Sequence, residues 1–131
     1  MSRTLLVPIL ALAALATSAG GAETPPEQSV SVELSNFRFT PDVVNLQRGT
    51  QYRLRIVNRA SGGHNFVAKE FFANSAIAAE DQAKIVAGKV EVDGGETVDI
   101  RLVPNVAGTY RLRCTHFMHS TFGMTGTIVV R

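Results

Sequence analysis

The sequence has 131 residues, a length typical of one domain, with 45% hydrophobic and 18% charged residues as in a globular chain. From Glu23 onward twelve basic and eleven acidic residues nearly cancel, and no dense basic stripe is visible, which argues against a nucleic-acid-binding protein. The single cysteine, Cys114, excludes an internal disulfide framework, and the lack of repeats argues against a solenoid or fibre.

The first 22 residues have the three-part pattern of a secretory signal peptide. Arg3 gives a positive start, an apolar run covers Leu5 to Ala16, and small residues lead to Ala22. We expect cleavage after Ala22, with Ala19 as the second choice. An uncleaved anchor is the alternative, although the apolar run is shorter than the roughly 20 residues of a membrane-spanning helix. Residues 23–29 then predict a polar linker, and residues 30–131 the folded domain.

Apolar and polar residues alternate in four later segments, taken in chain order: Val30–Ser35, Tyr52–Val57, Val98–Val103 and Tyr110–Cys114. A period of two is typical of half-buried antiparallel strands, and Gly-, Pro- and Asp-containing turns separate these segments. The pattern predicts an all-β sandwich or barrel. One segment, Phe71–Val86, is rich in alanine and has loosely helical spacing, so we expect a short helical insertion there.

Soft and imidazole donors are concentrated in the window Cys114–Met124, which holds Cys114, His116, Met118, His119 and Met124. The remaining histidine, His64, follows a glycine-rich turn. Taken singly, these residues fit a buried structural cysteine and surface histidines, but their concentration favours a metal site. One thiolate, two imidazoles and a weak thioether form the ligand set of blue copper. Zinc would prefer four strong ligands.

A nucleophilic cysteine enzyme is a weaker interpretation of the same residues. Cys114 and His119 could supply the thiol and the base, but a third orienting group and a substrate-pocket signature are not evident in the sequence.

The motifs resemble those of the cupredoxin family, the blue type 1 copper proteins that include plastocyanin and azurin, over about Val30 to Arg131. Three pieces carry the resemblance: Gly63-His64-Asn65-Phe66, the strand Gly108–Cys114, and His119 to Met124 followed by the segment Thr125–Val130. The resemblance implies a Greek-key β-sandwich with one copper ion, Cu(I) or Cu(II), at one end. It also implies His64, Cys114, His119 and Met124 as metal ligands, with Asn65 linking the two ligand loops.

The ligand loop departs from the family pattern. Four residues separate Cys114 from His119, as in azurin-like loops, and four separate His119 from Met124, as in plastocyanin-like loops. His116 and Met118 are extra donors without a counterpart. His119 is the preferred ligand because His116 lies too near Cys114, and Met118 is an alternative axial ligand.

These features predict a periplasmic one-electron carrier that is a monomer and not an enzyme. Electrons would leave through the exposed edge of His119, which Phe117, Met118 and Phe122 flank. We expect transient redox protein partners, no nucleic acid and no stable membrane insertion after signal cleavage. The alternative function is copper binding for tolerance or delivery, which the extra donors His116 and Met118 motivate.

Overall fold

The computed structural model describes residues 20, 21 and 23–131, so the expected signal peptide lies almost wholly outside the described residues. These residues form ten strands and two short helices, here in chain order: β1 (Gln28–Ser35), β2 (Arg38–Thr40), β3 (Val43–Leu46), β4 (Tyr52–Asn58), β5 (His64–Val67), α1 (Lys69–Ala73), β6 (Ser75–Ile77), the 3-10 helix η1 (Ala79–Lys84), β7 (Lys89–Val92), β8 (Thr97–Pro104), β9 (Gly108–Arg113) and β10 (Thr125–Val130). No helix among these residues has the length and apolar character needed to cross a membrane.

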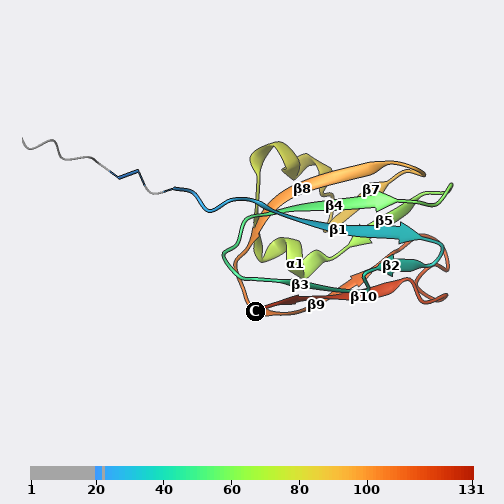
Figure 1. Ribbon diagram of the computed structural model, residues 1–131. Coiled ribbons are helices and arrows are strands. Elements are labelled where there is room, and N and C mark those ends of the chain that lie inside the picture. The colour runs from blue at the N-terminus through green and yellow to red at the C-terminus, as the bar shows by residue number, and fades with distance from the viewer. Residues whose placement is uncertain (1–19, 22) are drawn as a thin grey trace, which may run out of the picture.

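Two five-stranded sheets pack face to face, which confirms the expected β-sandwich (Figure 1). The first sheet has the order β2-β1-β4-β8-β6 and the second β3-β10-β9-β5-β7. The four alternating segments became β1, β4, β8 and β9, with their apolar residues facing inward. β1 begins at Gln28, two residues inside the expected linker.

Most strand pairs are antiparallel, as expected from the sequence, but two are parallel. β1 pairs with β4 in parallel, with Val32 opposite Ile56, and β3 pairs with β10 in parallel, with Val44 opposite Ile128. Alternation reveals which face of a strand is buried but not the direction of its neighbour, so the sequence pattern carried no information on this point.

Apolar side chains of both sheets form one continuous core. Its largest members form a chain of aromatic contacts through Phe39, Phe66, Phe72, Phe71 and Tyr110, with ring centroids 5.5–6.0 Å apart. Such edge and tilted pairs add to the stabilisation from burial. The core extends to the end of the sandwich where β5 begins and β9 ends, and there it meets the histidines.

The segment Phe71–Val86 is not a single helical insertion. α1 begins before it at Lys69, the strand β6 follows, and η1 comes next. β6 pairs with the edge of β8, so Ala76 lies opposite Val103. Pairing with an open sheet edge satisfies backbone groups that a continuous helix would have satisfied internally, and a three-residue strand is too short to show a period.

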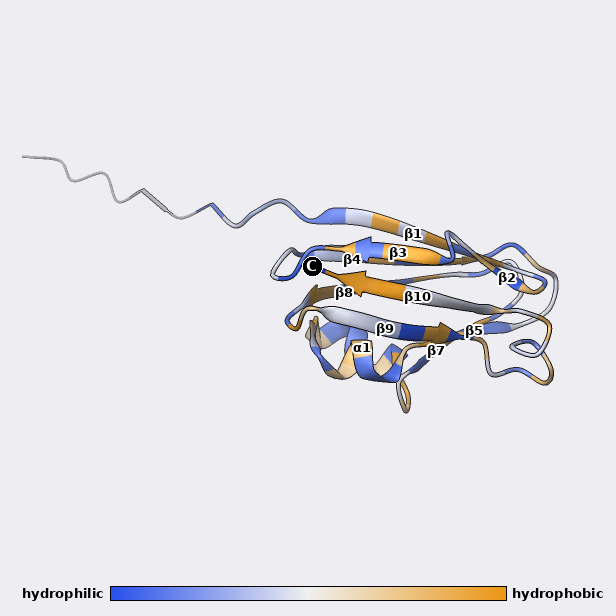
Figure 2. Cartoon of the chain, turned by 90° about the horizontal axis from the view of Figure 1, so that it is seen from below, coloured by the Kyte–Doolittle hydropathy of each residue, from blue (hydrophilic) through white to orange (hydrophobic). Residues whose placement is uncertain are grey.

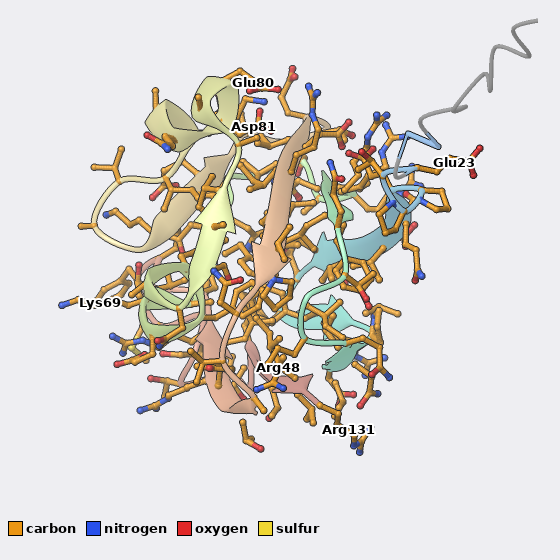
Figure 3. All side chains as sticks on the ribbon, turned by 90° about the vertical axis from the view of Figure 1, so that its left-hand side faces the viewer. Glu23, Arg48, Lys69, Glu80, Asp81 and Arg131 are labelled. Atoms are coloured by element: carbon orange, nitrogen blue, oxygen red, sulfur yellow. The ribbon has the colours of Figure 1, made fainter. Side chains whose placement is uncertain are left out.

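A buried carboxylate fixes η1 to β8. Asp81 accepts hydrogen bonds from Lys84 Nζ (2.6 Å) and from the backbone N–H of Arg101 (2.8 Å). Burial alone would raise the pKa of Asp81, but these donors outweigh it and hold the pKa below its usual value of 3.8. Figure 3 shows Asp81 beside Glu80 on this helix, and Arg101 also forms an ion pair with Glu80.

Candidate metal centre

Three segments that are distant in sequence meet at one end of the sandwich. His64 is the first residue of β5, Cys114 directly follows β9, and His119 and Met124 lie in the loop that connects β9 to β10. In Figure 1 this loop lies at the right-hand end, at the tip of the orange and red strands. Strand pairing thus brings together His64, Cys114 and His119, and Met124 follows His119 in the same loop.

The turn that precedes His64 is fixed by a buried amide. Asn58 Nδ2 donates to the carbonyls of Gly62 and Val92, both at 2.9 Å. The β7–β8 turn packs so closely here that a Cβ on Gly94 would lie 2.0 Å from the carbonyl oxygen of Ser61. The backbone before His64 therefore has little freedom, which fixes where β5 starts.

The donor atoms of His64, Cys114 and His119 all lie within 4.8 Å of one another. The two Nδ1 atoms are 3.0 Å apart, and Cys114 Sγ lies 3.8 Å from that of His64 and 3.4 Å from that of His119. His64 and Cys114 are fully buried, whereas His119 is partly exposed. Two imidazole nitrogens and one sulfur converging in this way fit a trigonal N₂S copper site.

Met124, the expected fourth donor, is joined to this cluster through its backbone. Its side chain is fully buried, and its carbonyl accepts a hydrogen bond from the backbone N–H of Cys114 at 3.1 Å. Its own N–H donates to the carbonyl of His119 at 3.0 Å. Gly123, with φ of 95°, allows the chain to turn back at this point.

Asn36, in the turn between β1 and β2, orients the buried histidine. Its side-chain oxygen lies 3.0 Å from Nε2 of His64, so this nitrogen carries the proton and Nδ1 keeps its lone pair for a metal. Asn36 was not identifiable from the sequence, because it belongs to no motif and lies far from His64 along the chain.

The amide of Asn65 links the two ligand segments, as the family resemblance implied. Its Oδ1 accepts from the backbone N–H of Thr115 at 2.8 Å, and its Nδ2 donates to Thr115 Oγ1 and to Glu91 Oε1, both at 2.9 Å. Its own backbone N–H points at Cys114 Sγ, 3.5 Å away. This arrangement holds the sulfur and the His64 strand at a fixed separation.

The two extra donors lie outside the cluster of converging atoms. His116 Nε2 is 2.9 Å from Glu91 Oε2, and its ring stacks on that of His119 with centroids 5.5 Å apart. Met118 is exposed and has a positive φ of 63°. The structure therefore places His116 at the rim and brings His119 to the sulfur.

Both clustered histidines favour the neutral form. Burial lowers the pKa of His64, and the nearby His119 and His116 lower it further. Burial also lowers the pKa of His119, with a smaller contribution from His116. A neutral imidazole offers a lone pair to a metal without first losing a proton. Protons therefore compete less with the metal for that nitrogen.

Four exposed apolar residues of the His119 loop and the β1–β2 turn, here called the apolar ring, lie near the partly exposed His119 in the chain or in space. Its members, with their exposed fractions, are Phe37 (38%), Met118 (42%), Phe122 (60%) and Phe117 (90%). Phe37 contacts the His119 ring edge to face with centroids 5.0 Å apart, and contacts Phe122 at 5.2 Å. The sequence had indicated the other three residues, but not Phe37, which comes from the β1–β2 turn.

The sandwich and this donor set define a cupredoxin with a residue set like that of a type 1 copper site. The chain belongs to this family, because the model of the cupredoxin-like domain matches residues 8–130. No curated protein matches the sequence significantly.

Several solved structures share the fold. Auracyanin B is 25% identical, and the match covers 85% of this chain and 93% of that one, with a TM-score of 0.57. The auracyanin of the photosynthetic bacterium Roseiflexus castenholzii is 16% identical over 79% of this chain and 97% of its own, with a TM-score of 0.61. A multicopper oxidase of Aquifex aeolicus, 15% identical, also matches 85% of this chain but only 31% of its own, with a TM-score of 0.62.

Proposed function

We propose that this protein is a one-electron carrier that holds one copper ion per chain. The observation that carries the proposal is the convergence of two imidazole Nδ1 atoms and one sulfur within 4.8 Å, beside the buried thioether of Met124. When bound, copper supplies a one-electron couple between Cu(I) and Cu(II). His64, Cys114 and His119 would hold the ion with two imidazole nitrogens and a thiolate, and Met124 would add a weak thioether donor.

The surrounding residues would keep this site nearly unchanged between the two oxidation states. Asn36 orients His64, and Asn65 joins Thr115 to the strand that carries His64. A site that does not rearrange when an electron arrives exchanges electrons quickly. The partly exposed edge of His119, inside its apolar ring, provides the route for the electron to the surface. A weak redox encounter needs only a small patch of this kind.

We propose no bond-making chemistry for this chain. The multicopper oxidase matches along only about a third of its own length, whereas auracyanin B matches along nearly all of its length. Export to the periplasm, a monomeric state and transient redox partners complete the proposal. The signal pattern of Met1–Ala22 supports the location.

Copper handling for tolerance or delivery is the second candidate function. The exposed thioether of Met118 favours it, because a soft donor at the rim of the site could receive or pass on Cu(I). The first experiment therefore measures the visible spectrum of the Cu(II)-loaded protein, its electron self-exchange rate, and the transfer of Cu(I) to a chelator. Rapid exchange with slow transfer supports the carrier. Slow exchange with rapid transfer would support handling.

Three substitutions test the ligand assignment. Cys114→Ser should remove the intense band of charge transfer between thiolate and Cu(II) from the visible spectrum, while the apolar core preserves the fold. His119→Gly should lose the band or need added imidazole to recover it. His116→Ala should keep it, because His116 points toward Glu91 rather than toward the sulfur. If His116→Ala lost the band and His119→Gly kept it, the ligand assignment would be wrong.

A further inference from the structure

A hollow with three cations lies on the outer face of the second sheet, apart from the metal centre. It has a volume of about 230 Å³ and is lined by Val67, Lys69, Glu70, Ala87, Arg111 and Arg113. We refer to it as the basic hollow. Figure 2 shows α1 lying beside β9, the two elements that supply the cations, and Figure 3 shows Lys69 at the outer edge of the molecule.

The strand pattern explains why these charges gather. Arg111 and Arg113 are two residues apart on β9 with the buried Leu112 between them, so both point to the solvent side of the sheet. Arg113 lies opposite Val67, the last residue of β5, and Lys69 begins α1 two residues later. Three positive side chains therefore converge from two segments of the chain.

Four other arginines, on or next to β4 and β8 of the first sheet, each have a carboxylate partner, whereas Arg38 on β2 has none within the described part of the chain. The ion pairs are Arg53–Glu27 (2.9 Å), Arg55–Asp99 (3.2 Å), Arg59–Glu33 (3.0 Å) and Arg101–Glu80 (3.1 Å). Within residues 23–131, Lys69, Arg111 and Arg113 form no ion pair. The three cations of the basic hollow thus differ from these four arginines in having no ion-pair partner among the described residues.

The lining of the basic hollow contains one carboxylate, that of Glu70, against its three cations. The whole chain from Glu23 onward has an excess of only one positive charge, so the local excess exceeds the total. Side chains of like charge that are held together repel one another, and an incoming anionic group would relieve the repulsion.

We propose that the basic hollow is a docking site for an acidic patch on a partner protein. Arg111 and Arg113 present planar guanidinium groups that can each grip a carboxylate with two hydrogen bonds, and Lys69 adds a compact charge at the rim. The three cations are exposed, so they meet groups that stand on another protein's surface rather than enclosing a small anion. A nucleic acid would need a longer basic track along its phosphates.

The position of the basic hollow sets the orientation of such a partner. β9 runs from Arg113 directly into Cys114, so a protein bound here lies on the flank of the metal end. The apolar ring around His119 is a separate surface. Charge complementarity of this kind mainly raises the rate of encounter and fixes the orientation, and salt weakens it. The proposal needs no metal and stands independently of the proposed electron transfer.

The test is an NMR titration of the protein with a ten-residue polyglutamate peptide at low salt. Backbone amide shifts should be confined to residues 67–70 and 111–113. The double substitution Arg111→Gln/Arg113→Gln should weaken binding about tenfold or more, and Lys69→Gln about two- to threefold. The matched control is Arg53→Gln/Arg55→Gln, which removes the same charge at the same strand spacing on the first sheet. It should change the affinity less than twofold.

Three outcomes would overturn the proposal. One is a loss of affinity that is equal in the two double variants, since net charge alone would then explain it. Another is full displacement of the peptide by inorganic phosphate when both supply the same concentration of negative charge. That result would make the basic hollow a binding site for small anions. The third is tighter binding of a single-stranded DNA decamer than of the peptide at the same residues.

Discussion

Asn65→Ala should lower both the stability of the metal-free protein and its copper affinity. The Asn65 amide joins two segments of the chain whether or not a metal is bound. The change removes three hydrogen bonds, two to Thr115 and one to Glu91. A hydrogen bond contributes about 1 kcal/mol net. Because Thr115 is exposed, its backbone N–H can hydrogen-bond to water instead. We therefore expect the free energy of unfolding to fall by about 2 kcal/mol rather than by the sum over all three hydrogen bonds.

Urea unfolding of the metal-free variant, followed by circular dichroism, measures this loss. For a domain of this size it corresponds to a fall in Tm of about 10 °C. The matched control is Asn45→Ala. The oxygen of Asn45 accepts only an exposed, 3.3 Å hydrogen bond from Arg131, so its removal should cost less than about 0.5 kcal/mol.

Competition with a copper chelator gives the second readout. Residues that orient ligands typically change metal affinity by about 10- to 100-fold when they are removed, and Asn65→Ala should fall in that range. The reasoning would be refuted if the Asn65 and Asn45 variants unfolded at the same urea concentration. It would also be refuted if both bound copper as the parent protein does.

Three further predictions concern other parts of the sandwich. Asp81→Asn should cost about 2 kcal/mol at pH 7, because it weakens hydrogen bonds to a charged group. Since the folded pKa of Asp81 is depressed, the difference from the parent should shrink as pH falls below about 4, and a difference independent of pH would contradict the assignment. Gly94→Ala should cost more than about 2 kcal/mol because its Cβ would meet a backbone carbonyl at 2.0 Å, whereas Gly62→Ala, with open space around it, should cost little in the same urea assay. Glu91→Ala should speed the loss of Cu(I) to a chelator about tenfold, because it releases the His116 ring that stacks on His119. Glu91→Gln should not, because its amide oxygen still accepts from Asn65 and its NH₂ can donate to His116 Nε2 in the tautomer where that nitrogen accepts; equal rates in both variants would argue against this role.

The sequence predicted those parts of the fold that a local pattern encodes. The alternation in Tyr52–Val57 and Val98–Val103 identified two central strands, because each has one face in the core and one in water. The same logic failed for Phe71–Val86. There an alanine-rich segment had no strong periodicity, and its structure depends on the open edge of β8, which only the folded sheet provides.

The candidate site divides in the same way. His64, Cys114, His119 and Met124 were identifiable because their residue types are scarce in this chain and three of them lie in one window. Asn36, Phe37 and Glu91 were missed, since each acts through a contact with a residue at least 25 positions away. Ordinary polar and aromatic residues in turns and on exposed strand faces carry no signal until the fold shows what they touch.

The complete burial of Cys114 makes its thiol a built-in reporter of local opening in the metal-free protein. An alkylating reagent cannot reach a sulfur with no exposed surface, so labelling requires the segment between β9 and β10 to lift away from the strand that carries His64. When closing is faster than labelling, the measured rate is the intrinsic thiol rate multiplied by the fraction of molecules that are open. Alkylation kinetics followed by mass spectrometry would therefore give the free energy of opening this one loop, separately from the global unfolding that urea measures.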